Sequence, residues 1–171
     1  GKSTLLMNIM CNMAMNGLES VFFSLEMSRQ QVVDRILSSV SSIPLNRIKT
    51  GQLLDADWTA LQAGVSKLID KHIHIIDRPA MNINHIAAIS RKFARRAKLG
   101  CIGVDYLQLC RADTKSRFDE ISEVSRALKS IAKTTETPVI ALSQLSRQVE
   151  NRPNKRPINS DLRESGQIEQ D

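Results

Sequence analysis

The sequence predicts an α/β fold with a mostly parallel central sheet and helices on both faces. Short, β-prone apolar segments alternate along the chain with longer stretches whose apolar residues recur at helical spacing. Parallel strands require crossover connections, which the intervening helices supply. Strands are expected at residues 21–25, 72–77, 101–105 and 138–143. Ligands bind such sheets beyond the carboxyl ends of the strands, so polar residues there are the first candidates for chemistry.

The segments between these strands carry helix signals. An apolar face at helical spacing occupies residues 3–16, and Gly17 follows it as a stop. Ser28 and Gln31 form a capping-box pattern at the start of the second helix.

Later helices are marked by their flanking residues. Pro44 and Gly51 bracket a predicted loop, after which a helix starts at Asp55 or Asp57. Asn82 is placed to cap the helix that precedes the third strand. A last helix follows a polar loop and leads into the fourth strand.

The composition fits one globular domain with a substantial core, since 42% of the 171 residues are hydrophobic. The chain has no apolar run long enough to cross a membrane and no secretory leader pattern. Three cysteines without a C-x-x-C pair argue against a disulfide framework or a zinc site and fit a reducing cytoplasm. A net charge of +6 permits nucleic-acid binding, while 4% aromatic residues argue against base-stacking platforms.

The first four residues, Gly1, Lys2, Ser3 and Thr4, match the end of the P-loop pattern G-x-x-x-x-G-K-[ST]. In that motif the glycine lets backbone N–H groups turn toward phosphate, and the lysine reaches the β- and γ-phosphates. The Ser3 hydroxyl would ligate Mg²⁺, and the helix that starts here would direct its positive end at the anion. A chance triplet at a helix start is the alternative.

Three other polar residues follow strands. Asp105 ends a strand of small and apolar residues, like the Walker B acid that holds hydrated Mg²⁺, although a turn-capping aspartate would have the same position. Glu26 lies just past the first strand, where a carboxylate can orient or deprotonate water or simply be solvated. Gln144 ends the last strand, where an amide can bind a terminal phosphate and report its presence to the following loop.

Several blocks resemble the signatures of DnaB-family replicative helicases, in that family's order. They are SLEM at 24–27, DYLQL at 105–109, ALSQL at 141–145 and SDLRESG at 160–166. KTGQL at 49–53, followed by Asp57 and Trp58, resembles the family's segment between two of these motifs. The likeness covers essentially the whole chain and implies a RecA-like P-loop NTPase fold, with residues 1–171 as a single, partial domain.

The resemblance implies a role for each of the nucleotide-site candidates. Lys2 and Ser3 would bind phosphate and metal, Glu26 would be the catalytic carboxylate, and Asp105 would be the Walker B acid. Gln144 would couple the phosphate state to DNA. The implied cofactors are ATP and Mg²⁺.

The resemblance also implies partners. Residues 147–166 lose the apolar periodicity and form a long exposed loop, in which Arg163, Glu164 and Gly166 would touch the backbone of single-stranded DNA. The basic residues of 111–117 form either a second DNA-facing loop or solvated surface. A homo-hexamer in the bacterial cytoplasm, encoded by host or phage, would act on forked duplex DNA together with a primase and a helicase loader.

In this family an arginine finger would follow Asp171 and a collar domain would precede Gly1, so the isolated segment is expected to hydrolyse ATP poorly. Two other classes stay open. A RecA-like ATPase that is not a helicase is disfavoured by the 160–166 block. A non-hydrolysing nucleotide-binding module would lack Glu26 or Asp105, and both are present.

Overall fold

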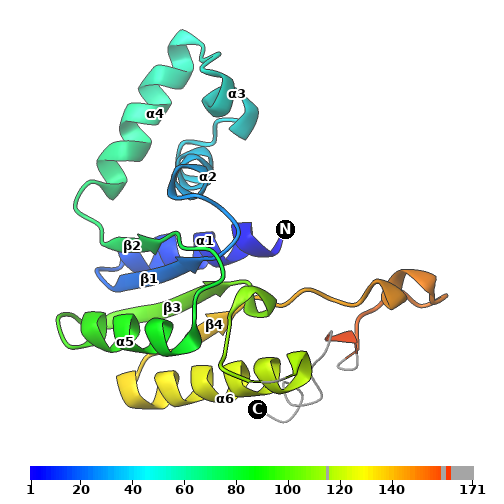
Figure 1. Ribbon diagram of the computed structural model, residues 1–171. Helices are drawn as coiled ribbons and strands as arrows, with labels where there is room; N and C mark the ends of the chain where they lie inside the picture. The colour runs from blue at the N-terminus through cyan, green and yellow to red at the C-terminus, as the bar shows by residue number, and fades with distance from the viewer. Residues whose placement is uncertain (115, 159–160, 163–171) are drawn as a thin grey trace.

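The computed structural model describes residues 1–114, 116–158 and 161–162 and confirms the predicted α/β fold (Figure 1). Its strands are β1 (Glu19–Ser24), β2 (Ile73–Ile76), β3 (Leu99–Asp105) and β4 (Val139–Ala141). They form a sheet of order β2-β1-β3-β4 in which every pairing is parallel. The central strands β1 and β3 therefore have neighbours on both sides.

Helices connect the strands in the manner that parallel pairing requires. They are α1 (Lys2–Met15), α2 (Arg29–Ser41), α3 (Leu45–Thr50), α4 (Asp55–Leu68), α5 (Ile83–Ala94) and α6 (Arg117–Thr135), with short 3-10 turns η1 (Leu107–Leu109) and η2 (Arg147–Asn151). In Figure 1, α1 and α2 lie on one face of the sheet, and α5 and α6 cover the other. Among the described residues, no helix has the length and apolar character that a membrane span needs.

Two apolar cores hold the sheet between these helix layers. Side chains alternate along β1, so Val21 and Phe23 enter the core beneath α5 and α6 while Phe22 enters the one beneath α1 and α2. All three cysteines are buried and free. Burial raises the pKa of the Cys11 thiol to about 11, because the thiolate would lose its hydration.

Two glycines let α1 lie close against β3. A Cβ at Gly103 would lie 3.1 Å from the sulfur of Met10 and 3.2 Å from a methyl carbon of Leu6. A Cβ at Gly100 would lie 3.1 Å from the sulfur of Met13. Later positions of α1 thus face earlier positions of β3, so the helix runs antiparallel to the strand. Its first turn is thereby carried to the carboxyl end of β3.

The predicted helix caps are confirmed. The Ser28 N–H donates to the Gln31 side chain at 3.1 Å, and the Gln31 N–H donates to the Ser28 hydroxyl at 3.4 Å. The Asn82 side chain accepts a backbone N–H two residues further on at 2.9 Å. Helix α4 begins at Asp55, and the carboxylate of Asp57 accepts the N–H just before the helix at 2.9 Å.

The loop predicted between Pro44 and Gly51 is wrong, because these residues bracket the short helix α3. Proline fixes φ at a value that suits a helix start, and Gly51 adopts a φ of 70°, the left-handed conformation that ends many helices. A helix of six residues is too short to show an apolar periodicity. Strand limits also differ: β3 starts at Leu99 and β4 ends at Ala141.

Candidate functional site

Three predicted site residues lie at the carboxyl edge of the sheet. Glu26 follows β1, Asp105 ends β3 and Gln144 follows β4, and these strands are neighbours in the order β1-β3-β4. The Leu25 N–H donates to the Asp105 carbonyl at 2.9 Å, and the Leu142 N–H donates to the Val104 carbonyl at 2.9 Å. Parallel strands of similar length place their ends at one edge, which explains the convergence.

Asp105 is the most unusual side chain at this edge. It is only 1% exposed, and neither carboxylate oxygen has a hydrogen-bond partner among the described residues. Burying a carboxylate without a partner is costly, so its oxygens are expected to meet a cation or a donor that binds there. The described residues contain no group of three or more His, Cys, Asp or Glu side chains arranged to hold a metal. A bare carboxylate fits Mg²⁺, which keeps waters and takes few protein ligands.

The P-loop segment (residues 1–4) lies beside Asp105. Gly1 is the N-cap of α1, so the free N–H groups of the first helical turn begin at Lys2. The Lys2 ammonium lies 4.4 Å from the centroid of the Tyr106 ring, a cation–π contact with the residue that follows Asp105. A flexible cationic side chain and a helix N-terminus therefore stand next to the buried acid, an arrangement suited to an anion.

Glu26 is exposed in the turn between β1 and α2. The Ser24 hydroxyl donates to the Met27 carbonyl at 2.7 Å and holds this turn, and Ser28 then caps α2. Helix α2 is further anchored at Arg29, whose backbone N–H donates to the Asp77 carboxylate at 2.8 Å and lowers the pKa of that half-buried acid. The carboxylate of Glu26 thus stands on a fixed turn.

Gln144 is also exposed, and its backbone is held by a residue to which the sequence assigned no role. The Gln108 side chain exchanges two hydrogen bonds with the backbone of Gln144. Because the contact joins residues 36 positions apart, no local sequence signal marks it. The only hint is that Gln108 belongs to the DYLQL block.

Beyond Gln144 the chain forms an arm (residues 146–158) that projects away from the sheet in Figure 1. Asp161, only 5% exposed, closes the base of this arm. Its carbonyl accepts the Ser146 N–H at 2.7 Å, and its carboxylate accepts the Ile158 N–H at 2.8 Å and pairs with Arg152. Leu145 and Leu162 form an antiparallel bridge beside it.

Removing this base is expected to loosen the arm. In Asp161→Ala, trypsin should cut after the exposed Lys155 at least about fivefold faster, because the arm loses its carboxylate contacts and opens more often. Proline follows both Arg152 and Arg156, so the arm's trypsin sites are Arg147 and Lys155, and cleavage is followed at Lys155 by the mass of its fragments. Glu150→Ala, an exposed acid in the same arm, is the matched control and should leave the rate unchanged. Equal rates in all three proteins would contradict the anchoring role.

The predicted DNA-contacting residues Arg163, Glu164 and Gly166 lie outside the described residues, as does Lys115. Within 111–117, Arg111 pairs with Glu120 of α6 at 3.6 Å.

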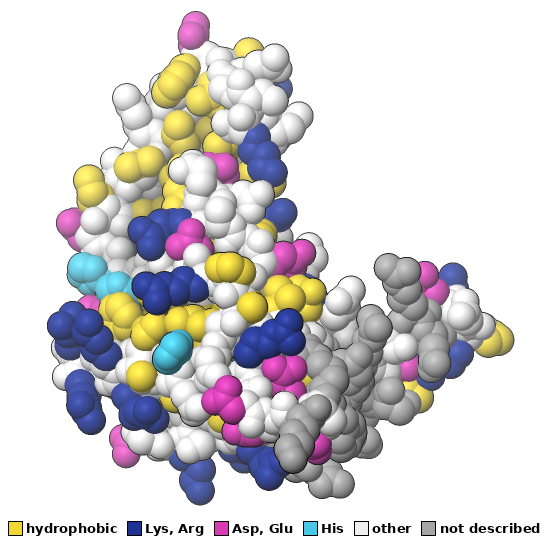
Figure 2. Space-filling model, viewed as in Figure 1, with side chains coloured by type: hydrophobic (Ala, Val, Ile, Leu, Met, Phe, Trp, Pro, Cys, Tyr) yellow, Lys and Arg dark blue, Asp and Glu magenta, His cyan; other side chains and the backbone are white. Residues whose placement is uncertain are grey.

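Exposed basic residues also gather around the end of α5, where Figure 2 shows Lys and Arg side chains over this helix. Residues 95–98 lead directly into the start of β3. This basic face therefore lies at the amino edge of the sheet, opposite the candidate site.

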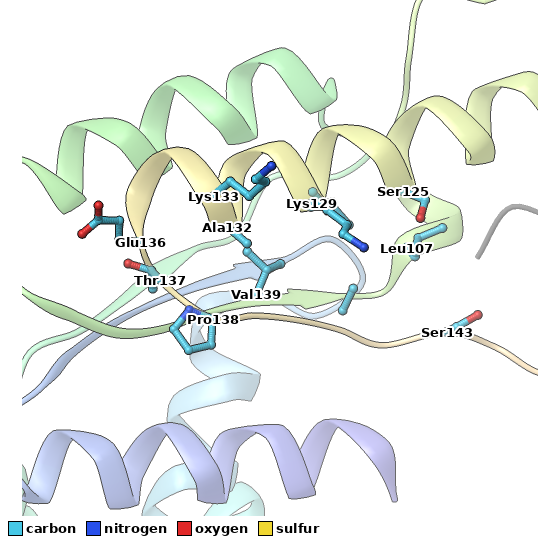
Figure 3. A pocket seen from close by; sticks show the side chains of 12 residues that line it. Leu107, Ser125, Lys129, Ala132, Lys133, Glu136, Thr137, Pro138, Val139 and Ser143 are labelled. Carbon is cyan, nitrogen blue, oxygen red and sulfur yellow. The ribbon is translucent and has the colours of Figure 1, made fainter. Parts of the chain in front are cut away.

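One cavity has a volume of about 600 Å³. It runs between α6 and β4, with Val139 and Pro138 on one wall and Lys129 and Lys133 on the other (Figure 3). Its lining includes none of the predicted site residues. Among the described strands, β4 is an edge strand of the sheet.

This arrangement of strands, helices and strand-end residues is that of the RecA-like ATPase domains. One solved ATPase domain matches with a TM-score of 0.94 and 36% identity, over 99% of this chain and 62% of that one. A DnaB-like replicative helicase, solved in a study of its interactions with primase, matches with a TM-score of 0.92 and 36% identity, over 98% of this chain and 41% of that one.

The chain belongs to the family of the DnaB-like helicase C terminal domain, whose model matches residues 1–171. The replicative DNA helicase DnaB of Geobacillus stearothermophilus is 45% identical over 175 residues, which cover all of this chain. The chain spans 38% of the length of that relative. The resemblance read from the signature blocks is thus confirmed.

Proposed function

We propose that this chain is the motor of a replicative DNA helicase, which hydrolyses ATP to move along single-stranded DNA and separate the duplex at the replication fork. The observation that carries the proposal is the buried, unpartnered carboxylate of Asp105, next in sequence to Tyr106, whose ring the lysine of the P-loop segment contacts. Membership of the DnaB-like helicase family indicates that ATP hydrolysis would drive DNA unwinding.

The nucleotide phosphates would lie at the start of α1. Lys2 would exchange its contact with the Tyr106 ring for the β- and γ-phosphates, and the N–H groups of residues 1–4 would donate to their oxygens. Asp105 and the Ser3 hydroxyl would hold Mg²⁺, since both are oxygen ligands at the same strand edge. When bound, Mg²⁺ neutralises charge on the phosphates during phosphoryl transfer.

Glu26 and Gln144 would act on either side of the terminal phosphate. Glu26, on the turn after β1, would orient the attacking water and accept its proton. The Gln144 amide would donate to a γ-phosphate oxygen. The chain runs from Gln144 into the arm. Loss of the contact with the γ-phosphate would therefore change the conformation of the segment that leads to the DNA-contacting residues.

DNA and protein partners complete the proposal. Arg163, Glu164 and Gly166 follow the Asp161 anchor within five positions and would contact the backbone of single-stranded DNA without regard to its sequence. The working form would be a homo-hexamer in the bacterial cytoplasm, where a neighbouring subunit supplies an arginine to each ATP. A primase and a helicase loader would act with it on forked DNA.

The test is the ATPase rate of the full-length protein in Mg²⁺, with and without single-stranded DNA, together with strand displacement on a forked duplex. The proposal expects single-stranded DNA to raise the ATPase rate and expects ATP to be required for displacement. ATP turnover that DNA leaves unchanged, with no strand displaced, would rule the motor out.

A further inference from the structure

The Gln108 side chain links the segment after β3 to the segment after β4. Its Nε2 donates to the Ser143 hydroxyl at 2.8 Å and to the Gln144 carbonyl at 3.2 Å. Its Oε1 accepts the Gln144 N–H at 3.2 Å. A primary amide offers one acceptor and two donors, so a single side chain makes all three contacts.

The backbone alone pairs these two segments only as far as Leu142. The Leu142 N–H donates to the Val104 carbonyl at 2.9 Å, and the Leu107 N–H donates to the Leu142 carbonyl at 2.8 Å. At Leu107 the chain turns into η1, so this hydrogen bond to Leu142 lies at the point where the segment leaves the direction of β3. Gln108 takes over there and pairs with both backbone groups of Gln144, as a neighbouring strand would.

We infer that Gln108 is a positioning residue that fixes the backbone of Gln144, so that the Gln144 side chain faces the phosphate and passes its state to the arm. The inference rests on the proposed function. Gln108 is suited to this task because buried Leu107 anchors η1 in the core. The same short segment contains Asp105, the proposed metal ligand, and Tyr106, whose ring contacts Lys2. Residues 105–108 therefore connect the metal site and the lysine to Gln144.

The alternative is that Gln108 only satisfies backbone groups and adds general stability. Two variants of the full-length protein separate these readings. Gln108→Met keeps the length and removes every contact, whereas Gln108→Glu keeps the acceptor for the Gln144 N–H and removes both donors. Gln62→Met on the exposed face of α4 is the matched control.

Hydrogen exchange tests the contact itself. In Gln108→Met, amide exchange in the peptide that contains residues 142–146 should be about tenfold faster than in wild type, because the Gln144 N–H loses its acceptor. Gln108→Glu should stay closer to wild type. Unchanged exchange in Gln108→Met would overturn the positioning role, whatever the ATPase shows.

Steady-state kinetics then test the consequence. Gln108→Met should lose about tenfold of the stimulation by single-stranded DNA, whereas Gln62→Met should keep the stimulation of wild type. In a Gln144→Ala background the same change should have no further effect, because the side chain that Gln108 positions is gone. Additive losses, or full stimulation in Gln108→Met, would overturn the inference. A wild-type protein that DNA fails to stimulate would instead overturn the proposed function, and hydrogen exchange would still decide the contact.

Discussion

Full-length protein carrying Glu26→Gln is expected to bind ATP normally and to hydrolyse it about 10²- to 10⁴-fold more slowly than wild type, with or without DNA. Glutamine has the size of glutamate and can still hydrogen-bond a water, but it cannot accept the proton that the water must lose. A loss confined to the chemical step is therefore the expected signature of a general base.

The fold should tolerate this substitution. Glu26 is exposed, and the turn beneath it is held by the Ser24 hydroxyl and the Met27 carbonyl, neither of which changes. Substitutions at such surface positions shift the free energy of unfolding by no more than about 0.5 kcal/mol. A large loss of activity with an unchanged melting temperature would thus point to chemistry rather than misfolding.

The measurements are single-turnover hydrolysis in Mg²⁺ and equilibrium binding of a fluorescent ATP analogue. Glu123→Gln provides the matched control, since it makes the same chemical change on α6, which covers the opposite face of the sheet from α2, and should retain wild-type turnover. Turnover by Glu26→Gln above about a tenth of the wild-type rate would remove Glu26 from the chemical step.

The sequence predicted the sheet well because the middle of each central strand is a run of apolar residues or glycine. Residues 21–23 and 102–104 are buried on both faces, so a continuous apolar run is what such strands require. Capping residues were equally informative, since Ser28 and Asn82 act on backbone groups only two or three positions away. The short helix α3 escaped prediction because Pro44 and Gly51 serve helix ends and loops alike.

The candidate site was less predictable from local pattern. Taken singly, Glu26 and Gln144 show no sign of function. They become site candidates because β1, β3 and β4 are neighbours, which places both residues at the same edge of the sheet as Asp105. Strand order depends on how helices pack on the sheet, which no single segment encodes. The contact between Gln108 and Gln144 has the same origin. The family resemblance supplied what periodicity could not, because its blocks mark strand ends that meet in space.

The substitution Asp105→Asn is expected to have opposite effects on activity and on stability. Activity should fall by about 10²-fold or more, since a metal ion contributes several kcal/mol to phosphoryl transfer and each 1.4 kcal/mol is about a factor of ten. Without nucleotide the free energy of unfolding should instead rise, on the order of 1 kcal/mol, because a buried carboxylate without partners is replaced by a neutral group of similar shape.

Ligand-dependent unfolding separates these effects in one experiment. In Mg²⁺, a non-hydrolysable ATP analogue at a hundred times its dissociation constant should raise the free energy of unfolding of wild type by about 2.7 kcal/mol. The same concentration should raise the free energy of unfolding of Asp105→Asn far less. Asp70→Asn, at an exposed aspartate after α4, should behave as wild type in both conditions. If Asp105→Asn were less stable than wild type without ligand, the carboxylate would have a structural partner. Asp105 is identified as a metal ligand if Asp105→Asn is more stable than wild type without ligand and less stable than wild type with Mg²⁺ and nucleotide. If the carboxylate were structural, Asp105→Asn would be less stable than wild type under both conditions.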